Sequence, residues 1–137
     1  MNNREIMLKN YTNPEFKRDL RGSNIVIEEY KSRSCNDDVV LYFNVKGLII
    51  KEMTFLGDGC AVSTSNANII CKIFTNKQID ECKLIAEEYL KMINNEAFDK
   101  QIVGELIIFE EIKNQRSRKT CATLTMNTFN NYINKSY

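Results

Sequence analysis

Five cysteines and no histidine define the chemistry open to this chain of 137 residues. Without an imidazole, the chain has neither a histidine base nor a histidine metal ligand of its own. A cysteine thiolate remains available as a nucleophile or as a soft metal ligand. We expect the chain in the reducing cytoplasm, where an odd number of cysteines argues against a disulfide framework. Metal ligands, reactive thiols and plain buried thiols are the roles left to consider.

Three of the cysteines lie where we expect secondary-structure elements to begin or end. Cys35 falls in a polar stretch between two β-rich runs, and Cys60 directly follows the turn residues 57–59. We place Cys121 at the N-terminal end of the last predicted helix. Loops can converge at such positions, and the N-terminus of a helix lowers the pKa of a thiol.

A tetrahedral metal site needs one ligand beyond these three thiolates. Asp37 is the natural fourth ligand, because a short loop can turn the side chains of Cys35 and Asp37 toward one point. Three thiolates and one carboxylate suit Zn²⁺ or Fe²⁺ without any imidazole. The chain has no C-x-x-C pair, so three unrelated thiols remain the alternative explanation of this pattern.

The elements that would position these residues follow from the hydrophobic pattern. Residues 24–56 contain three β-rich runs, and Lys46-Gly47 forms a two-residue turn between the last two. They predict a three-stranded antiparallel meander. After residue 59 the apolar period changes from two to about 3.6 residues, which indicates helices.

Four helices are predicted, over residues 4–11, about 62–74, from 79 to about 94, and about 121–134. A capping box at Thr75–Gln78 opens the third of them. Cys71 and Cys82 lie on apolar helix faces, so we interpret both as buried hydrophobic residues. Residues 96–120 are ambiguous: the apolar run 106–109 fits a helix turn or a strand, and we expect a loop before Cys121.

Composition limits the remaining possibilities. The length fits one domain covering residues 1–137, of class α+β, with a small three-stranded antiparallel sheet packed against several helices. Lys and Arg (19) nearly balance Asp and Glu (18), which argues against a nucleic-acid partner. No run of 18 apolar residues is present and the first residues are not continuously apolar. We therefore expect a soluble, cytoplasmic protein with no membrane partner.

Four motifs in order resemble those of the NifU/IscU-type iron-sulfur cluster assembly proteins, over nearly the whole chain. Cys35-Asn36-Asp37 matches the family's Cys-Gly-Asp, and Gly57-Asp58-Gly59-Cys60 matches its Gly-x-Gly-Cys before a Ser-rich helix start. Arg118-Lys119-Thr120-Cys121-Ala122-Thr123-Leu124 matches Arg-x-x-Cys-Ala-Thr-Leu. Tyr11-Thr12-Asn13-Pro14 matches an early Tyr-x-x-Pro more loosely.

Two features of the sequence are similar to the SufU type within that family. Thr120 stands where the scaffold branch has a histidine, and a longer stretch separates the second and third motifs than in that branch. Asn36 replaces the glycine of the first motif. Asparagine is the non-glycine residue that best tolerates a left-handed backbone, so the loop can keep its shape.

The resemblance implies a SufE/NifU-like fold and a role in iron-sulfur cluster biogenesis. It implies Cys35, Asp37, Cys60 and Cys121 as ligands of Zn²⁺, with Fe²⁺ or a [2Fe-2S] cluster as alternatives. Cys35 would also be the catalytic sulfur acceptor of a sulfurtransferase-type carrier. The implied partner is a SufS-type pyridoxal-phosphate cysteine desulfurase, which we expect to supply a replacement ligand that frees Cys35.

Arg118 would offset the negative charge of three thiolates and a carboxylate, or meet an acidic surface of the partner. Two other functions remain open. A scaffold that assembles a transient [2Fe-2S] cluster would use the same ligands, although the missing histidine and the longer spacing favour sulfur relay. A purely structural metal in an interaction module predicts that chelation unfolds the protein.

Overall fold

A computed structural model describes residues 1–31 and 37–137 of the chain. Three long strands form the sheet: β1 (Ile25–Lys31), β2 (Asp38–Lys46) and β3 (Ile49–Leu56). Each pairs with the next in antiparallel register, and Gly47 takes a positive φ of 60° in the β2–β3 turn. The predicted meander is confirmed.

A fourth, two-residue strand extends the sheet beyond the prediction. β4 (Lys77–Gln78) pairs antiparallel with Ile49 and Ile50, giving the order β1-β2-β3-β4. The predicted capping box is therefore wrong. The Thr75 hydroxyl donates to the Cys71 carbonyl (2.8 Å) and accepts the N–H of Met53 (3.2 Å), so it joins the end of one helix to β3 instead of capping the next.

The predicted helices are present with shifted ends: α1 (Asn3–Thr12), α2 (Ala61–Phe74), α3 (Ile79–Ile93) and α5 (Arg116–Ser136). Residues 100–114 form a short helix α4 (Lys100–Val103) and a 3-10 helix η1 (Gly104–Asn114), so the run 106–109 is helical and not a strand. A 3-10 helix has three residues per turn, which hides it from a search for a period of 3.6. Only Gln115 separates η1 from α5, where a longer loop was expected.

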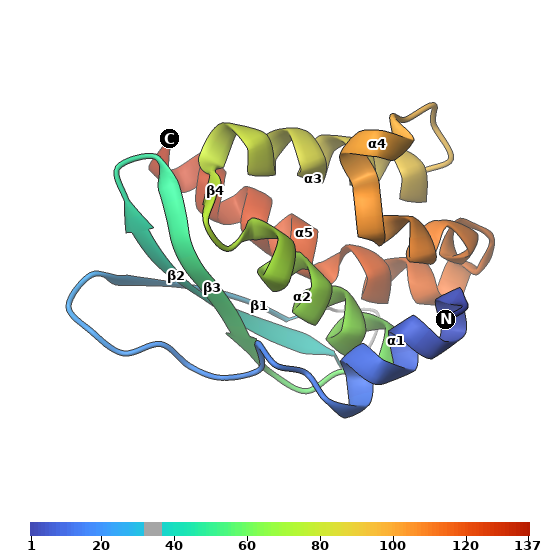
Figure 1. Cartoon of the computed structure of the whole chain (residues 1–137), viewed down its shortest axis with the longest axis horizontal. Coiled ribbons are helices and arrows are strands. Elements are labelled where there is room, and N and C mark those ends of the chain that lie inside the picture. Colours follow the sequence, from blue (N-terminus) through green and yellow to red (C-terminus); the bar gives the residue numbers. More distant parts are fainter. Residues whose placement is uncertain (32–36) are drawn as a thin grey trace.

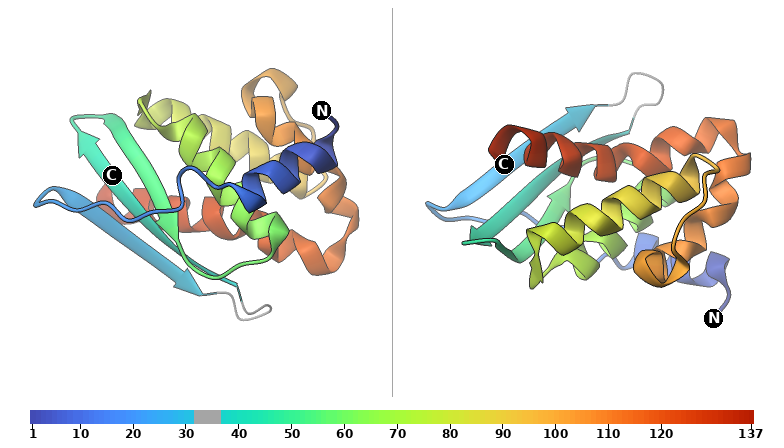
Figure 2. Two further views of the ribbon diagram at one scale, coloured as in Figure 1. Left: turned by 60° about the horizontal axis from the view of Figure 1, so that its bottom comes forward. Right: turned by 90° about the horizontal axis from the view of Figure 1, so that it is seen from above.

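The helices pack on one face of the sheet (Figures 1 and 2). Aromatic rings make the central contact: Phe43 of β2 stacks on Tyr132 of α5 at 4.3 Å, and Phe129 of α5 lies 4.8 Å from Phe74 of α2. All four side chains are buried. Such pairs add about 0.5–1.5 kcal/mol each to the free energy of burial. These contacts fix β2, α2 and α5 relative to one another.

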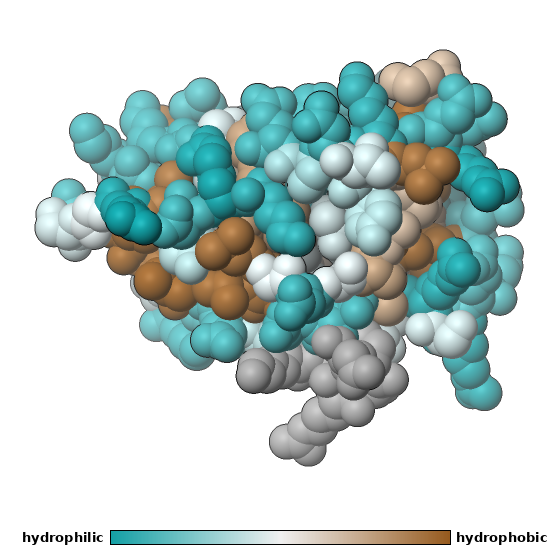
Figure 3. Space-filling model, turned by 90° about the horizontal axis from the view of Figure 1, so that it is seen from below, coloured by the Kyte–Doolittle hydropathy of each residue, from teal (hydrophilic) through white to brown (hydrophobic). Residues whose placement is uncertain are grey.

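The opposite face of the sheet is exposed in part, since Thr54 on it is buried. Ile27 pairs with Tyr42 on that side and is 57% exposed. Figure 3 shows apolar side chains at the surface among hydrophilic ones when the molecule is seen from below. Among the residues that the structure describes, no helix combines the length and apolar character needed to cross a membrane.

Candidate metal centre

The first two ligand candidates meet because one loop is tied to the start of β2. Asp37 directly precedes β2, and Cys60 is the N-cap residue of α2. The N–H of Asp38 donates to the Asp58 carbonyl (2.9 Å), and the N–H of Asp58 donates to the Asp38 carboxylate (2.7 Å). Gly57 allows this approach, because a Cβ there would lie 2.4 Å from the Asp38 carbonyl oxygen and its φ is +129°.

The third candidate comes from α5, which a buried hydrogen-bond chain holds in place. The Tyr89 hydroxyl donates to the carbonyl of Ala122 (2.6 Å) and accepts from the side-chain amide of Asn66 (2.9 Å). Tyr89 and Asn66 have no exposed surface. Since Ala122 follows Cys121, α2 and α3 both position the segment that carries this thiol.

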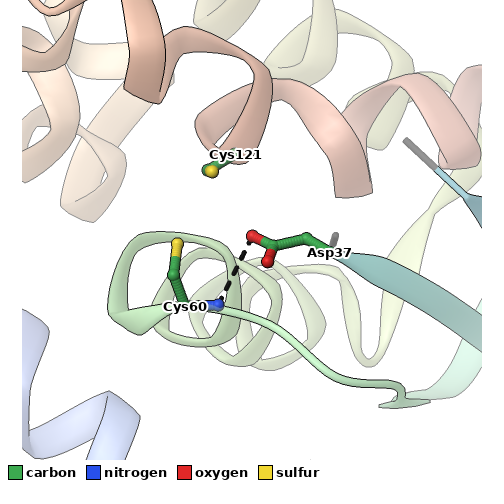
Figure 4. Close-up of side chains that lie close together, drawn as sticks. All are labelled: Asp37, Cys60 and Cys121. Atoms are coloured by element: carbon green, nitrogen blue, oxygen red, sulfur yellow. Dashed lines mark hydrogen bonds between the residues drawn. The ribbon is translucent and has the colours of Figure 1, made fainter. Parts of the chain in front are cut away.

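These three side chains point toward one another (Figure 4). One carboxylate oxygen of Asp37 and the sulfur atoms of Cys60 and Cys121 all lie within 4.8 Å of one another. The backbone N–H of Cys60 donates to the Asp37 carboxylate at 3.4 Å. Cys60 is exposed, whereas Cys121 is only 7% exposed, so the cluster is open on one side.

The surroundings keep the carboxylate charged and the inner thiol neutral. Burial raises the pKa of Asp37, but hydrogen bonds from Ser63, Cys121 and Cys60 outweigh it and lower that pKa below its usual value. Burial, followed by the neighbouring Cys60 and Asp37, raises the pKa of Cys121. A cation among these groups would reverse the second effect, because it stabilises the thiolate.

The donor set fits a tetrahedral zinc or iron site. Zn–S and Zn–O bonds of about 2.3 and 2.1 Å place ligand atoms of a tetrahedron about 3.5–3.8 Å apart. Atoms within 4.8 Å of one another need to approach by only about 1 Å to reach that spacing. Two sulfurs and one oxygen leave one position for a fourth ligand.

Cys35, the predicted fourth ligand and sulfur acceptor, and the neighbouring Asn36 lie outside the described residues. Cys121 does not lie at the mouth of its helix, since α5 begins five residues earlier, at Arg116. The prediction failed because the first turn is polar and carries no apolar periodicity. Arg118 is exposed and lines a groove of about 560 Å³ with Ala61 of α2.

The two cysteines interpreted as core residues are buried, as predicted. Neither Cys71 nor Cys82 has exposed surface. Burial raises the pKa of Cys82 to about 12 and that of Cys71 further, so both stay protonated at neutral pH. They lie outside the cluster of candidate ligands.

Ser63 belongs to the site and was missed from the sequence. Its hydroxyl lies 3.7 Å from the Cys60 sulfur and 3.3 Å from the Cys60 carbonyl oxygen. The signal was present in the serine-rich start of α2, where a residue three positions after an N-cap faces back toward the cap.

Comparison with known proteins adds a family to this geometry. The family described as NifU-like N terminal domain matches residues 2–122. The iron-sulfur cluster assembly scaffold protein IscU of Thermotoga maritima is 31% identical over 110 residues, covering 80% of this chain and 78% of that protein. The zinc-dependent sulfurtransferase SufU of Bacillus subtilis is 24% identical over 123 residues, covering 89% and 82%.

A solved structure has the same fold. It is described as a putative iron-sulfur cluster assembly scaffold protein for the SUF system, FiSufU, from Fervidobacterium islandicum AW-1. The two structures superpose with a TM-score of 0.88 at 28% sequence identity, and the match covers 92% of each chain.

Proposed function

The chain belongs to the family of NifU-like N-terminal domains, and from this membership we propose that it serves iron-sulfur cluster assembly as a zinc-dependent sulfur acceptor. One observation carries the proposal: Asp37, Cys60 and Cys121 come from distant parts of the sequence and converge within 4.8 Å. The Bacillus subtilis relative is named as a zinc-dependent sulfurtransferase, and thiolates and carboxylates are ligand types that zinc binds.

The proposed metal ligands are Cys35, Asp37, Cys60 and Cys121. When bound, Zn²⁺ would keep the coordinating thiols deprotonated near neutral pH. The chain itself supplies the carboxylate already in its charged form, because hydrogen bonds lower the pKa of Asp37. It also supplies an open side, where the exposed Cys60 meets solvent.

Cys35 is the proposed acceptor of sulfur. Its thiolate attacks the outer sulfur of a persulfide on a pyridoxal-phosphate cysteine desulfurase and forms a new S–S bond. The old S–S bond breaks, and its electron pair leaves with the donor thiolate. The step needs no oxidant or reductant, because one persulfide replaces another.

Arg118 is the proposed contact for the partner. It is exposed three residues before Cys121, where a partner that reaches the thiols would meet it. A guanidinium pairs with carboxylates in two parallel hydrogen bonds, so an acidic patch beside the donor persulfide is the expected counterpart.

A Cys35→Ala variant tests the acceptor role. We expect it to lose stimulation of a SufS-type desulfurase, measured as alanine released from cysteine. Cys82→Ala is the matched control, because it removes a buried thiol outside the cluster and should keep full stimulation. Full stimulation by Cys35→Ala would exclude the assigned role.

A cluster scaffold is the second candidate, since the Thermotoga maritima relative is named as one. Thiolates and a carboxylate can hold a [2Fe-2S] cluster as cargo on the same residues. Metal and acid-labile sulfide in anaerobically purified protein separate the two functions. One zinc per chain without sulfide supports the acceptor, and equal iron and sulfide support the scaffold.

A further inference from the structure

Ser63 lies between two of the candidate ligands without being a ligand itself. It sits in the first turn of α2 and is only 5% exposed. Its hydroxyl is 3.7 Å from the sulfur of Cys60, and hydrogen bonding from the same side chain helps to lower the pKa of Asp37. A hydroxyl that can donate to either group links the two ligands directly.

Gly59 leaves free the space that the Ser63 hydroxyl occupies. A Cβ on Gly59 would lie 2.2 Å from the Ser63 hydroxyl oxygen, far inside van der Waals contact. That Cβ would meet the Thr64 hydroxyl at 3.3 Å and the Ser63 Cβ at 3.4 Å, which are much milder contacts. Among the neighbours of Gly59, the Ser63 hydroxyl therefore depends most on the missing side chain.

Ser65 shows that the hydroxyl of Ser63 is used differently from its neighbours. The Ser65 hydroxyl donates within its own helix, to the carbonyls of Ala61 (2.6 Å) and Val62 (3.2 Å). Such back-bonding satisfies a buried hydroxyl without touching the site. Ser63 also approaches its own helix, at the Cys60 carbonyl, but reaches the ligand atoms as well.

We propose that Ser63 is a positioning residue for the metal centre: its hydroxyl, admitted by Gly59, holds Asp37 and Cys60 in the orientation that receives the ion. This inference rests on the proposed metal-dependent function. Asp37 has two oxygens, and because one of them accepts the N–H of Cys60 at 3.4 Å, the other is left for the metal. Groups that orient metal ligands in this way typically change metal affinity by about 10- to 100-fold when removed.

The test uses the full chain loaded with Co²⁺, whose thiolate charge-transfer and d–d bands report the ligand geometry. Zinc affinity is measured in parallel by competition with a chromophoric chelator. We expect Ser63→Ala to shift the cobalt bands and to weaken zinc binding about 10- to 100-fold. Ser65→Ala is the matched control, a serine of the same helix turned away from the site, and should leave the bands in place.

A second variant tests the linkage between Gly59 and the hydroxyl. Gly59→Ala should weaken zinc binding in the wild-type background, because its Cβ displaces the Ser63 oxygen. In the Ser63→Ala background it should weaken binding much less, since that oxygen is gone. Losses that add within about twofold would contradict the proposed linkage, because additivity is the behaviour of independent sites.

The outcomes distinguish failure of this inference from failure of the proposed metal-dependent function on which it rests. If the wild type binds neither cobalt nor zinc, the metal-dependent function fails and the inference fails with it. If the wild type binds both metals and Ser63→Ala matches it in spectrum and affinity, only the role of Ser63 is overturned.

Discussion

The Tyr89 hydroxyl supports the candidate metal centre from within the core. The variant Tyr89→Phe should therefore weaken the candidate metal centre as well as the packing of the core. The substitution keeps the ring and removes two buried hydrogen bonds, to Asn66 (2.9 Å) and Ala122 (2.6 Å). At about 1 kcal/mol for each bond, plus the cost of leaving the buried Asn66 amide without this acceptor, the loss is about 2–4 kcal/mol. For a chain of this length that corresponds to a fall in Tm of roughly 8–16 °C.

Urea unfolding of the metal-free protein measures this loss, with the slope m checked to be unchanged. Tyr132→Phe is the matched control: its ring also lies in the core, but among residues 1–31 and 37–137 its hydroxyl makes a single contact, with the hydroxyl of Tyr137 at 3.5 Å. The control should change the free energy of unfolding by less than about 0.5 kcal/mol. Equal losses of unfolding free energy in the two variants would refute the reasoning. They would show that the hydrogen bonds of the Tyr89 hydroxyl to Asn66 and Ala122 stabilise the fold no more than the hydroxyl of Tyr132 does.

Three further results are expected. Gly57→Ala should abolish tight zinc binding while the helices persist, because its Cβ would lie 2.4 Å from the Asp38 carbonyl oxygen. Zinc titration measures the loss of binding, and circular dichroism measures the helix content. Unchanged zinc affinity would contradict the packing argument. Glu88→Gln should lower Tm at neutral pH but not at low pH. Hydrogen bonds from Lys91 and from the Asp99 N–H lower the pKa of Glu88, so its stabilising effect is present above the ordinary pKa of about 4.3 and is lost as the pH falls through the lowered value. A difference in Tm that does not vary with pH would argue against this pairing. Chelation should leave the far-ultraviolet circular dichroism of the wild type unchanged, whereas unfolding on chelation would support a purely structural metal.

Hydrophobic period predicted most of the fold, because most of the long elements place apolar residues at regular spacing in the core. The strands around Phe43 and the helix faces that carry Cys71 and Cys82 follow the periods of two and 3.6 residues. Elements without such a face were missed or misplaced. The polar first turn of α5 has none, and β4 is a two-residue extension that depends on where α2 delivers the chain.

The site was predictable only as a set of candidates. The turn before Cys60 and the short spacing from Cys35 to Asp37 pointed to loops at element ends, but nothing in the spacing places Cys121 beside them. That placement depends on tertiary contacts, such as the Tyr89–Ala122 hydrogen bond. The role of Ser63 at the site could not be predicted for a similar reason. A hydroxyl near the start of a helix has several possible acceptors, and the sequence does not indicate which one it uses.

Because of the same contacts, we expect the fold to hold together without a metal ion. Asp37 and Cys60 are fixed by the hydrogen bonds between Asp38 and Asp58, and the segment of Cys121 is fixed by Tyr89. Each tie is made by protein groups alone, and the aromatic core around Phe43 lies behind them. A site prepared in this way can exchange a ligand without releasing the elements that carry the others. Ligand exchange is what a sulfur acceptor requires, because a thiolate that stays bound to its metal is a weak nucleophile.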